Sequence, residues 1–242
     1  GPISASLLDP TRGELRGLAT LAVLLLGSVV LVSLSLNAAG QRLPSGLDQS
    51  LYHFFQELRT PWADALMVFT AELGDYQVVL PLSLIVFGWL IWQRRPVAAW
   101  HWLAALGFGM TTNLLFKWLL PVSDPTDVLR QVQNYSFPSS HATFNTLVFG
   151  FLAVLLARSI PQARRWIVYL AAAFMIVPVA FARLYLGIHW LTDTLAGLCL
   201  GLIWVTVLGL AYNSHAAAVP VNWRALLASS AIALLVADLV HA

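Results

Sequence analysis

Long apolar runs are the feature of this 242-residue chain that most restricts its fold. A helix needs about 20 predominantly apolar residues to cross the hydrocarbon core of a bilayer. By that measure the sequence contains seven candidate spans, which are residues 17–36, 76–92, 97–119, 140–157, 166–182, 191–212 and 223–240. Only 10% of the residues are charged, whereas a soluble domain carries about 25%. The chain is therefore expected to be an integral membrane protein with an all-α, polytopic transmembrane bundle.

The two ends of the chain are expected to lie outside the core of this bundle. Gly1 and Pro2, without an initiating Met, look like the remnant of a removed tag, and residues 3–16 would form a cytoplasmic N-terminal segment. The membrane domain would cover residues 17–212, and residues 213–242 would add a loop and a seventh, C-terminal span. That span could lead into further domains of a longer parent chain.

The segment between the first two spans has a different character. Residues 47–75 mix apolar and charged side chains at helical spacing, which predicts one or two amphipathic helices at the membrane interface. Their aromatic residues could form an entry wall for a lipid, or simply an aromatic belt; these are Tyr52, Phe54, Phe55 and Trp62. Glu72 and Asp75 follow near the same face, where they could be solvated.

Basic residues predict how the bundle is oriented, because cytoplasmic loops of membrane proteins carry an excess of Lys and Arg. Counting crossings places eight arginines on one side, which should be the cytoplasm; they are Arg12, Arg16, Arg94, Arg95, Arg158, Arg164, Arg165 and Arg224. The expected location is a bacterial inner membrane, with the opposite face of the bundle towards the periplasm or exterior.

Several other features restrict the partners of the chain. A net charge of +2 with no basic stripe interleaved with aromatic residues gives no indication of a nucleic-acid partner. Cys199 is the single cysteine, so the chain forms no internal disulfide and this residue is expected to pack. Gly197 and Gly201, four residues apart in one span, allow close helix packing or a homodimer.

Ionisable and hydroxyl side chains gather at four span ends that share the outer face by the same crossing count. These residues are Lys117, then Ser139, Ser140 and His141, then Arg183, and finally His189 and Asp193. Ionisable groups within membrane spans are costly and usually line a cavity or pair with one another. The convergence of such distant segments therefore predicts a functional site.

The stretch Ser136–Phe144 places two serines and a histidine at a helix start. Pro138 fits the first position of this helix, where backbone N–H groups have no intrahelical acceptor and the dipole favours anions. The serine hydroxyls add donors, and His141 can give or take a proton near neutral pH. The alternative is a serine-rich helix cap with an incidental histidine.

The second polar stretch runs from Arg183 to Asp193. His189 and Asp193 are four residues apart, so on one helix they would share a face and the carboxylate would leave one imidazole nitrogen free as a nucleophile. On a continuous helix Arg183 would point away, so a bend is predicted at Gly187 that returns the guanidinium towards the imidazole. The alternative is a capped helix with Arg183 and Asp193 paired across the loop.

Together these motifs resemble the signature of the type 2 phosphatidic acid phosphatase (PAP2) family, membrane lipid phosphatases that share a core with vanadium haloperoxidases. The resemblance covers residues 71–212 and implies a six-span core. The second motif is matched by Pro138-Ser139-Ser140-His141, with Ser140 where glycine is usual. The third motif is matched by Arg183, His189 and Asp193, and Ala182 replaces its leading serine. The first motif keeps Lys117 and Pro125 but has Asp124 where the family has arginine.

The resemblance implies a role for each matched residue. His189 would attack phosphorus, Asp193 would orient it, and His141 would protonate the leaving oxygen and then activate water. Charge on the phosphate oxygens would be stabilised by Lys117, Ser139, Ser140 and Arg183. No metal or cofactor is implied, and zinc binding by the two histidines lacks a third ligand at a recognisable spacing.

Asp124 departs from this pattern, because an anion replaces a phosphate-binding cation. It could face away, bind a polar headgroup, or be neutralised by Arg130. The expected activity is hydrolysis of a lipid phosphate, with phosphatidic acid, phosphatidylglycerol phosphate and undecaprenyl phosphate or diphosphate as candidates. Two other functions stay open: a phosphotransferase that uses the same histidine, and a lipid-binding or transport module weakened by Asp124.

Overall fold

The computed structural model describes residues 17, 20–23, 25–27, 46–125 and 135–215. The seventh span expected at 223–240, the N-terminal residues 1–16 and Arg130 lie outside the described residues, as does most of the first expected span. The described parts of that first span, residues 17, 20–23 and 25–27, are helical.

The described chain is all-α, which confirms the expected fold class. It forms α3 (Gly46–Glu57), α4 (Pro61–Leu73), α5 (Tyr76–Trp92), α6 (Pro96–Leu119), α8 (Ser140–Ala157), the short 3-10 helix η1 (Gln162–Arg164), α9 (Arg165–Tyr185) and α10 (Leu191–His215). The expected amphipathic segment is two helices, α3 and α4. Gly74 and Asp75 separate α4 from α5, where Asp75 is the N-cap.

Four helical segments of the described chain are long and apolar enough to cross a membrane. They are Pro61–Trp92, Ser140–Ala157, Gln162–Tyr185 and Leu191–Ser214. The α6 helix is 24 residues long, yet it is not among them. Polar residues such as Asn113 and Lys117 lower its mean hydropathy, and both face the protein interior, as shown below.

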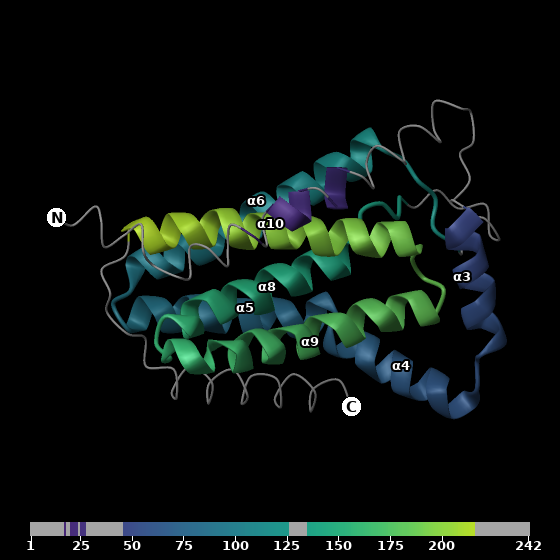
Figure 1. The fold of residues 1–242 in the computed structure, drawn as a ribbon, viewed down its shortest axis with the longest axis horizontal. Helices are drawn as coiled ribbons and strands as arrows, with labels where there is room; N and C mark the ends of the chain where they lie inside the picture. The colour runs from purple at the N-terminus through teal and green to yellow at the C-terminus, as the bar shows by residue number, and fades with distance from the viewer. Residues whose placement is uncertain (1–16, 18–19, 24, 28–45, 126–134, 216–242) are drawn as a thin grey trace.

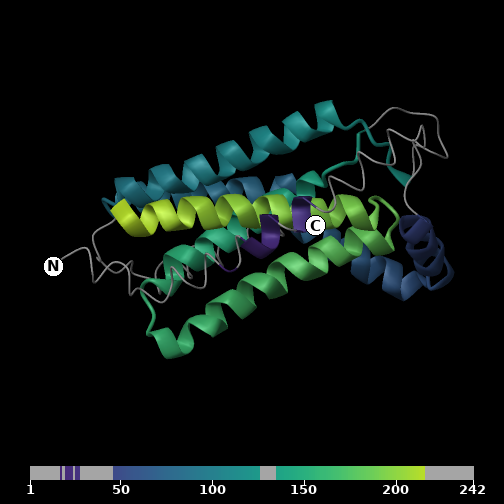
Figure 2. The same ribbon diagram turned by 45° about the horizontal axis from the view of Figure 1, so that its top comes forward.

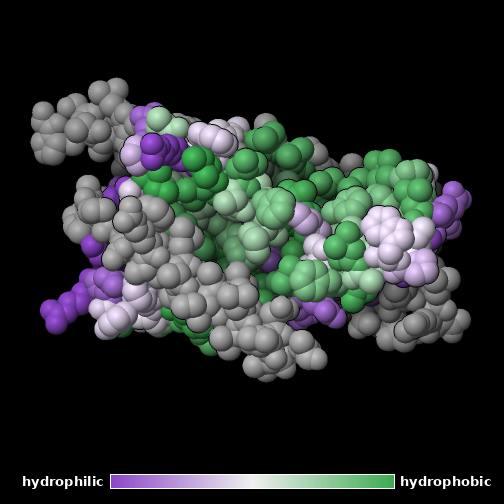
Figure 3. Space-filling view, turned by 90° about the horizontal axis from the view of Figure 1, so that it is seen from below, coloured by the Kyte–Doolittle hydropathy of each residue, from purple (hydrophilic) through white to green (hydrophobic). Residues whose placement is uncertain are grey.

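The bundle is organised around α8. Five helices, α5, α6, α8, α9 and α10, lie lengthwise beside one another, while α3 and α4 lie at one end (Figures 1 and 2). Residues 142–149 and 151–157 of α8 are buried, as expected for a helix that is apolar on all sides. Large apolar side chains of the outer helices are exposed instead, with Trp92, Trp118 and Phe174 about three-quarters exposed. Apolar residues cover much of the face in Figure 3, as a lipid-facing surface requires.

The two glycines of α10 allow it to approach α8 closely. A Cβ added at Gly197 would lie 2.5 Å from the backbone oxygen of Ser139, and one at Gly201 would lie 2.6 Å from Cβ of Thr146. The prediction of close helix packing is therefore correct, and this packing occurs within the chain. The pair gives no support to a homodimer, because α8 already covers it.

Gly197→Ala is expected to lower the stability of the bundle. The new methyl group would meet a backbone atom at the N-cap of α8, so one helix must shift, at a cost of about 1–3 kcal/mol. Thermal unfolding in detergent would show a lower melting temperature. Gly88→Ala on α5 is the matched control, because nothing lies within 4 Å of its added Cβ. Equal melting temperatures for the two variants would contradict this account of the α8–α10 contact.

The α3 helix is fastened to the start of α10. Asp48 is buried, at 2% exposure, and its two carboxylate oxygens accept from Thr192 N and Thr192 Oγ1, both at 3.0 Å. A carboxylate on the first free amides of a helix also interacts favourably with the helix dipole. Through this contact α3 covers the end of the bundle at which the polar residues gather.

Candidate active site

The four polar span ends meet at one end of the bundle, as the crossing count predicted. Lys117 ends α6, His141 begins α8, Arg183 lies in the last turn of α9, and His189 and Asp193 flank the start of α10. In Figures 1 and 2 these helix ends point to the same end of the bundle, and those of α9 and α10 lie beside α3. The rings of His141 and His189, 48 residues apart in the sequence, have centroids 6.5 Å apart.

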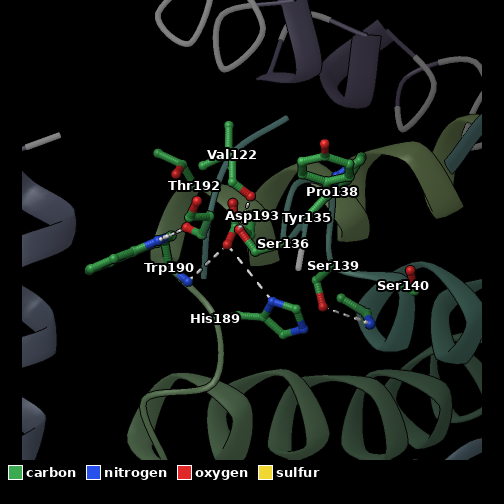
Figure 4. Close-up of polar contacts among 12 residues, drawn as sticks. Val122, Tyr135, Ser136, Pro138, Ser139, Ser140, His189, Trp190, Thr192 and Asp193 are labelled. Carbon is green, nitrogen blue, oxygen red and sulfur yellow. Dashed lines mark hydrogen bonds and ion pairs between the residues drawn. The ribbon is translucent and has the colours of Figure 1, made fainter. Parts of the chain in front are cut away.

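The α8 helix begins at Ser140, as the predicted span 140–157 requires, but the position predicted for Pro138 was wrong. Pro138 is not the first helical residue: Ser139 is the N-cap, in an extended conformation, and the helix begins at Ser140. The Phe137–Pro138 peptide bond is cis. The Ser139 hydroxyl accepts from Ala142 N at 3.4 Å (Figure 4), and Ser139 N donates to the backbone oxygen of Asp193 at 3.0 Å. The helix start is therefore tied to α10.

Asn113 of α6 holds this helix start, and the sequence analysis did not identify it. Its side chain is fully buried; Nδ2 donates to the oxygen of Pro138 at 3.3 Å and to Thr143 Oγ1 at 2.9 Å. Its Oδ1 accepts from the Ser140 hydroxyl at 2.8 Å. Ser140, predicted to bind phosphate, thus donates its proton to Asn113. The signal for Asn113 was its place one helical turn before Lys117 in an apolar run.

Lys117 lies behind the same loop. Its ammonium donates to the backbone oxygens of Tyr135 at 2.6 Å and Ser136 at 3.3 Å. An ammonium has three donors, so one donor remains beyond these two bonds. Lys117 therefore stabilises the segment that precedes Ser139 and Ser140 and places a positive charge next to it.

Asp124 follows the end of α6, next to Ser123. Ser123 accepts through its backbone oxygen from Trp190 Nε1 at 2.8 Å, and Trp190 directly follows His189 (Figure 4). The side chain of Asp124 is half-buried. The three predicted outcomes for Asp124, which are that it faces away, binds a polar headgroup or is neutralised by Arg130, stay predictions.

Gly187 makes the predicted bend between α9 and the second histidine. It has φ +69, which favours glycine, and an added Cβ would lie 2.7 Å from the Tyr52 ring. After this bend Ile188 N donates to the backbone oxygen of Arg183 at 3.0 Å. The guanidinium of Arg183 is consequently buried at the same end as His189, with 9% of the residue exposed.

His189 and Asp193 are neighbours, but not for the predicted reason. His189 lies before α10 begins at Leu191, so the two residues do not share a helix face. The chain turns instead: Asp193 Oδ2 accepts from Trp190 N at 3.0 Å and lies 3.8 Å from His189 Nδ1 (Figure 4). The carboxylate is fully buried. Nδ1 therefore faces the carboxylate, which leaves Nε2 as the nitrogen available for chemistry.

Asp75 is a further charged residue at the site. Its Oδ2 lies 3.6 Å from Arg183 Nη2 and 3.7 Å from His141 Nε2. The sequence analysis placed it near this face as a solvated group, and its side chain is indeed 40% exposed. The sequence analysis predicted no partners for it, because a carboxylate at the start of α5 cannot be matched from sequence with residues 66 and 108 positions away.

Several buried polar atoms at this end have no hydrogen-bond partner among the described residues. They include Arg183 Nε, His189 Nδ1 and Asp193 Oδ1. Unpartnered buried groups are rare in folded proteins and need an explanation such as a catalytic role. Here they belong to residues that the sequence motifs had already selected.

A small cavity adjoins His189 on the α3 side. Its walls are formed by Asp48, Leu51, Tyr52, Phe55, Leu184, His189, Trp190 and Leu191. Two of the four aromatic residues expected at an entry wall, Tyr52 and Phe55, thus line it, whereas Phe54 and Trp62 are exposed. The cavity combines apolar walls with the Asp48 carboxylate and one imidazole, and so lies next to the group that would react.

Two imidazoles, a buried guanidinium and a helix N-terminus lie at the same end of the bundle, and these are groups that phosphoryl transfer uses. The comparisons with known proteins agree. The sequence model of the PAP2 superfamily matches residues 118–216. Phosphatidylglycerophosphatase B of Bacillus subtilis (strain 168) is 30% identical over 149 residues, which cover 60% of this chain and 73% of that protein. The chain belongs to the PAP2 superfamily of membrane phosphatases.

Two further similarities extend beyond the motifs. An undecaprenyl-diphosphatase of Sulfolobus acidocaldarius is 26% identical over 192 residues, which cover 76% of this chain and 87% of that protein. The crystal structure of the transmembrane PAP2 type phosphatidylglycerolphosphate phosphatase from Bacillus subtilis superimposes with a TM-score of 0.62 at 25% identity, covering 77% of this chain and 93% of that chain. The fold is therefore that of an integral membrane PAP2 enzyme.

Proposed function

We propose that this membrane phosphatase hydrolyses a lipid phosphate through a phosphohistidine formed on His189. The observation that carries the proposal is the pair of imidazoles, 6.5 Å apart, with a buried carboxylate 3.8 Å behind His189 and the Arg183 guanidinium at the same end. This arrangement supplies a nucleophile, an acid and a cation without any requirement for a metal.

In the first step Nε2 of His189 attacks phosphorus, and the bond from phosphorus to the lipid oxygen breaks. His141 gives its proton to that oxygen, so the lipid leaves as an alcohol, or as a lipid monophosphate if the substrate is a diphosphate. In the second step His141 takes a proton from water, whose oxygen attacks phosphorus and releases inorganic phosphate. Asp193 stabilises the positive charge that His189 acquires, and Arg183 with the amides of α8 stabilises charge on the phosphate oxygens.

The substrate class follows from where the site lies. It opens at the end of a membrane bundle, beside a cavity walled by Tyr52 and Phe55, so the lipid tail would stay in the bilayer. Phosphatidic acid, phosphatidylglycerol phosphate and undecaprenyl phosphate or diphosphate are the candidates, and the names of the relatives support the last two classes. We place the site at the outer face of a bacterial inner membrane, since the arginine-rich loops lie at the other end.

A phosphate-release panel tests this function. Purified protein in detergent is given each candidate lipid with a chelator present, and inorganic phosphate is measured. Release from at least one lipid that survives chelation is expected. Transfer of labelled phosphate to an added alcohol, with none released to water, would instead indicate a phosphotransferase. Lipid binding without turnover would indicate a binding module.

Asp124→Arg is expected to raise kcat/KM on the preferred lipid by at least about 10-fold. A unit charge about 6 Å from phosphate is worth roughly 3 kcal/mol at an effective dielectric of about 20, and solvent exposure reduces this value. The substitution replaces a repulsion by an attraction. Asp124→Asn, which only removes the repulsion, should give a smaller gain. A loss of activity in both variants would show that Asp124 itself contributes to binding, for example through a polar headgroup.

A further inference from the structure

Asp75 faces both His141 and Arg183, and neither the motifs nor the mechanism above uses it. We propose that Asp75 is a positioning residue for His141, so that the site holds two facing histidine–aspartate pairs. This inference rests on the proposed function and deepens it: Asp193 serves the nucleophile, and Asp75 serves the proton donor. The two pairs are alike in distance, 3.8 Å for His189 and Asp193 and 3.7 Å for His141 and Asp75.

The orientation of the Asp75 carboxylate is fixed by the fold. Its Oδ1 accepts from Gln77 N at 3.3 Å as the N-cap of α5. This cap directs Oδ2 towards the site, where it lies between His141 Nε2 and Arg183 Nη2. One oxygen thus faces two cationic partners from two different helices, α8 and α9. A freely solvated surface aspartate would not need such an arrangement.

Asn145 holds the backbone at both members of the pair, Asp75 and His141. Its Nδ2 donates to the oxygen of Gly74 at 2.8 Å and to the oxygen of His141 at 2.9 Å, and its side chain is fully buried. Gly74, adjacent to Asp75, packs so tightly that an added Cβ would overlap Val179 of α9. The Asp75 backbone is therefore held in fixed register with both α8 and α9.

The groups around His141 indicate a function for the Asp75 carboxylate. Arg183 and His189 lie near the ring: Arg183 Nη2 shares the Asp75 Oδ2 contact with His141, and the two imidazole centroids are 6.5 Å apart. The Tyr76 ring packs against the His141 ring with centroids 5.0 Å apart. Asp75 places a carboxylate oxygen 3.7 Å from Nε2 of this ring. A carboxylate beside an imidazole stabilises its protonated form and orients the ring. His141 can then act as an acid towards the leaving oxygen.

The test is a double-mutant cycle between Asp75→Asn and His141→Gln. Asn caps helices as well as Asp does, so Asp75→Asn keeps the α5 cap and removes only the charge. Formation of the phosphoenzyme is followed by rapid quench with labelled lipid phosphate and with p-nitrophenyl phosphate, whose leaving group needs no protonation. Glu72→Gln, an exposed carboxylate three residues away, is the matched control and should behave like the wild type.

The expected loss in Asp75→Asn is about 10- to 100-fold with the lipid phosphate and under about 3-fold with the aryl phosphate, because general acid catalysis matters most for a poor leaving group. In the His141→Gln background the same substitution should cost no more than about 2-fold, since it acts through the missing ring. Equal losses with both substrates, full additivity with His141→Gln, or no loss would each overturn the inference. Absence of wild-type turnover on every lipid phosphate would instead overturn the proposed function, and the inference with it.

Discussion

Replacement of His189 by Ala is expected to reduce lipid-phosphate hydrolysis by about 10⁴-fold or more, the scale seen when a covalent nucleophile is removed. The reason is geometric: Nε2 of His189 faces the site while Nδ1 is directed at the buried Asp193. Among the described histidines, His189 and His141 are the two at this end that have a carboxylate next to the ring. With labelled substrate, the wild type should form a phosphoenzyme that is labile to acid and stable to base. The His189→Ala variant should form no phosphoenzyme.

The matched control for this experiment is His53→Ala, because His53 is an exposed histidine of α3. It should retain wild-type turnover and the phosphoenzyme. His141→Gln adds a second comparison, since loss of the proton donor should slow both steps without removing the attacking nitrogen. If acid-labile label persisted in His189→Ala but not in His141→Gln, the assignment of nucleophile and acid would have to be exchanged.

The fold and the site residues were predictable from sequence to different degrees. Apolar runs specified the helices, and α5 and α8 have the expected limits because their ends coincide with capping residues, Asp75 and Ser139. The meeting of four polar span ends followed from counting crossings, which needs no side-chain detail. The bend at Gly187 was predictable because Arg183 and His189 cannot face one another along a straight helix.

Contacts that depend on tertiary packing were not predictable. A period of four placed His189 and Asp193 on one helix face, but α10 begins only at Leu191, and Asp193 reaches the imidazole across a turn. Asn113 carries no motif, yet it links α6 to the α8 start through three hydrogen bonds. Asp75 lies between α4 and α5 in the sequence, and only the folded bundle brings it close to His141.

The Ser140–Asn113 bond also shows how one departure from the family pattern is accommodated. The family has glycine at position 140, and here a hydroxyl occupies the place. Because that hydroxyl donates to a buried amide oxygen at 2.8 Å, it is satisfied within the protein and does not need a phosphate partner. Ser140 is therefore part of the hydrogen-bond network that holds the α8 start, and its contact with phosphate stays a prediction.

Asp193→Asn is expected to lower kcat by about 10³-fold with little change in KM, as for a buried carboxylate that orients a catalytic imidazole. The amide has the same shape, so its single oxygen, Oδ1, can still accept from Trp190 N and preserve the turn. What is lost is the negative charge 3.8 Å from His189 Nδ1, which selects the tautomer with Nε2 free and stabilises the cation formed on phosphorylation. Pre-steady-state quench should show slower phosphoenzyme formation, with lipid binding unchanged.

Asp48→Asn is the matched control, because it changes another buried carboxylate, which lies on α3 and accepts hydrogen bonds from the start of α10. Asp48 accepts from Thr192 N and Oγ1 and has no role in orienting the imidazole, so its replacement should cost under about 10-fold in rate while lowering thermal stability by about 1 kcal/mol. If the two variants lost activity equally, the effect at Asp193 would reflect the folding of the α10 start. A loss confined to Asp193→Asn, in protein that melts like the wild type, would separate the charge behind the nucleophile from the structure that holds it.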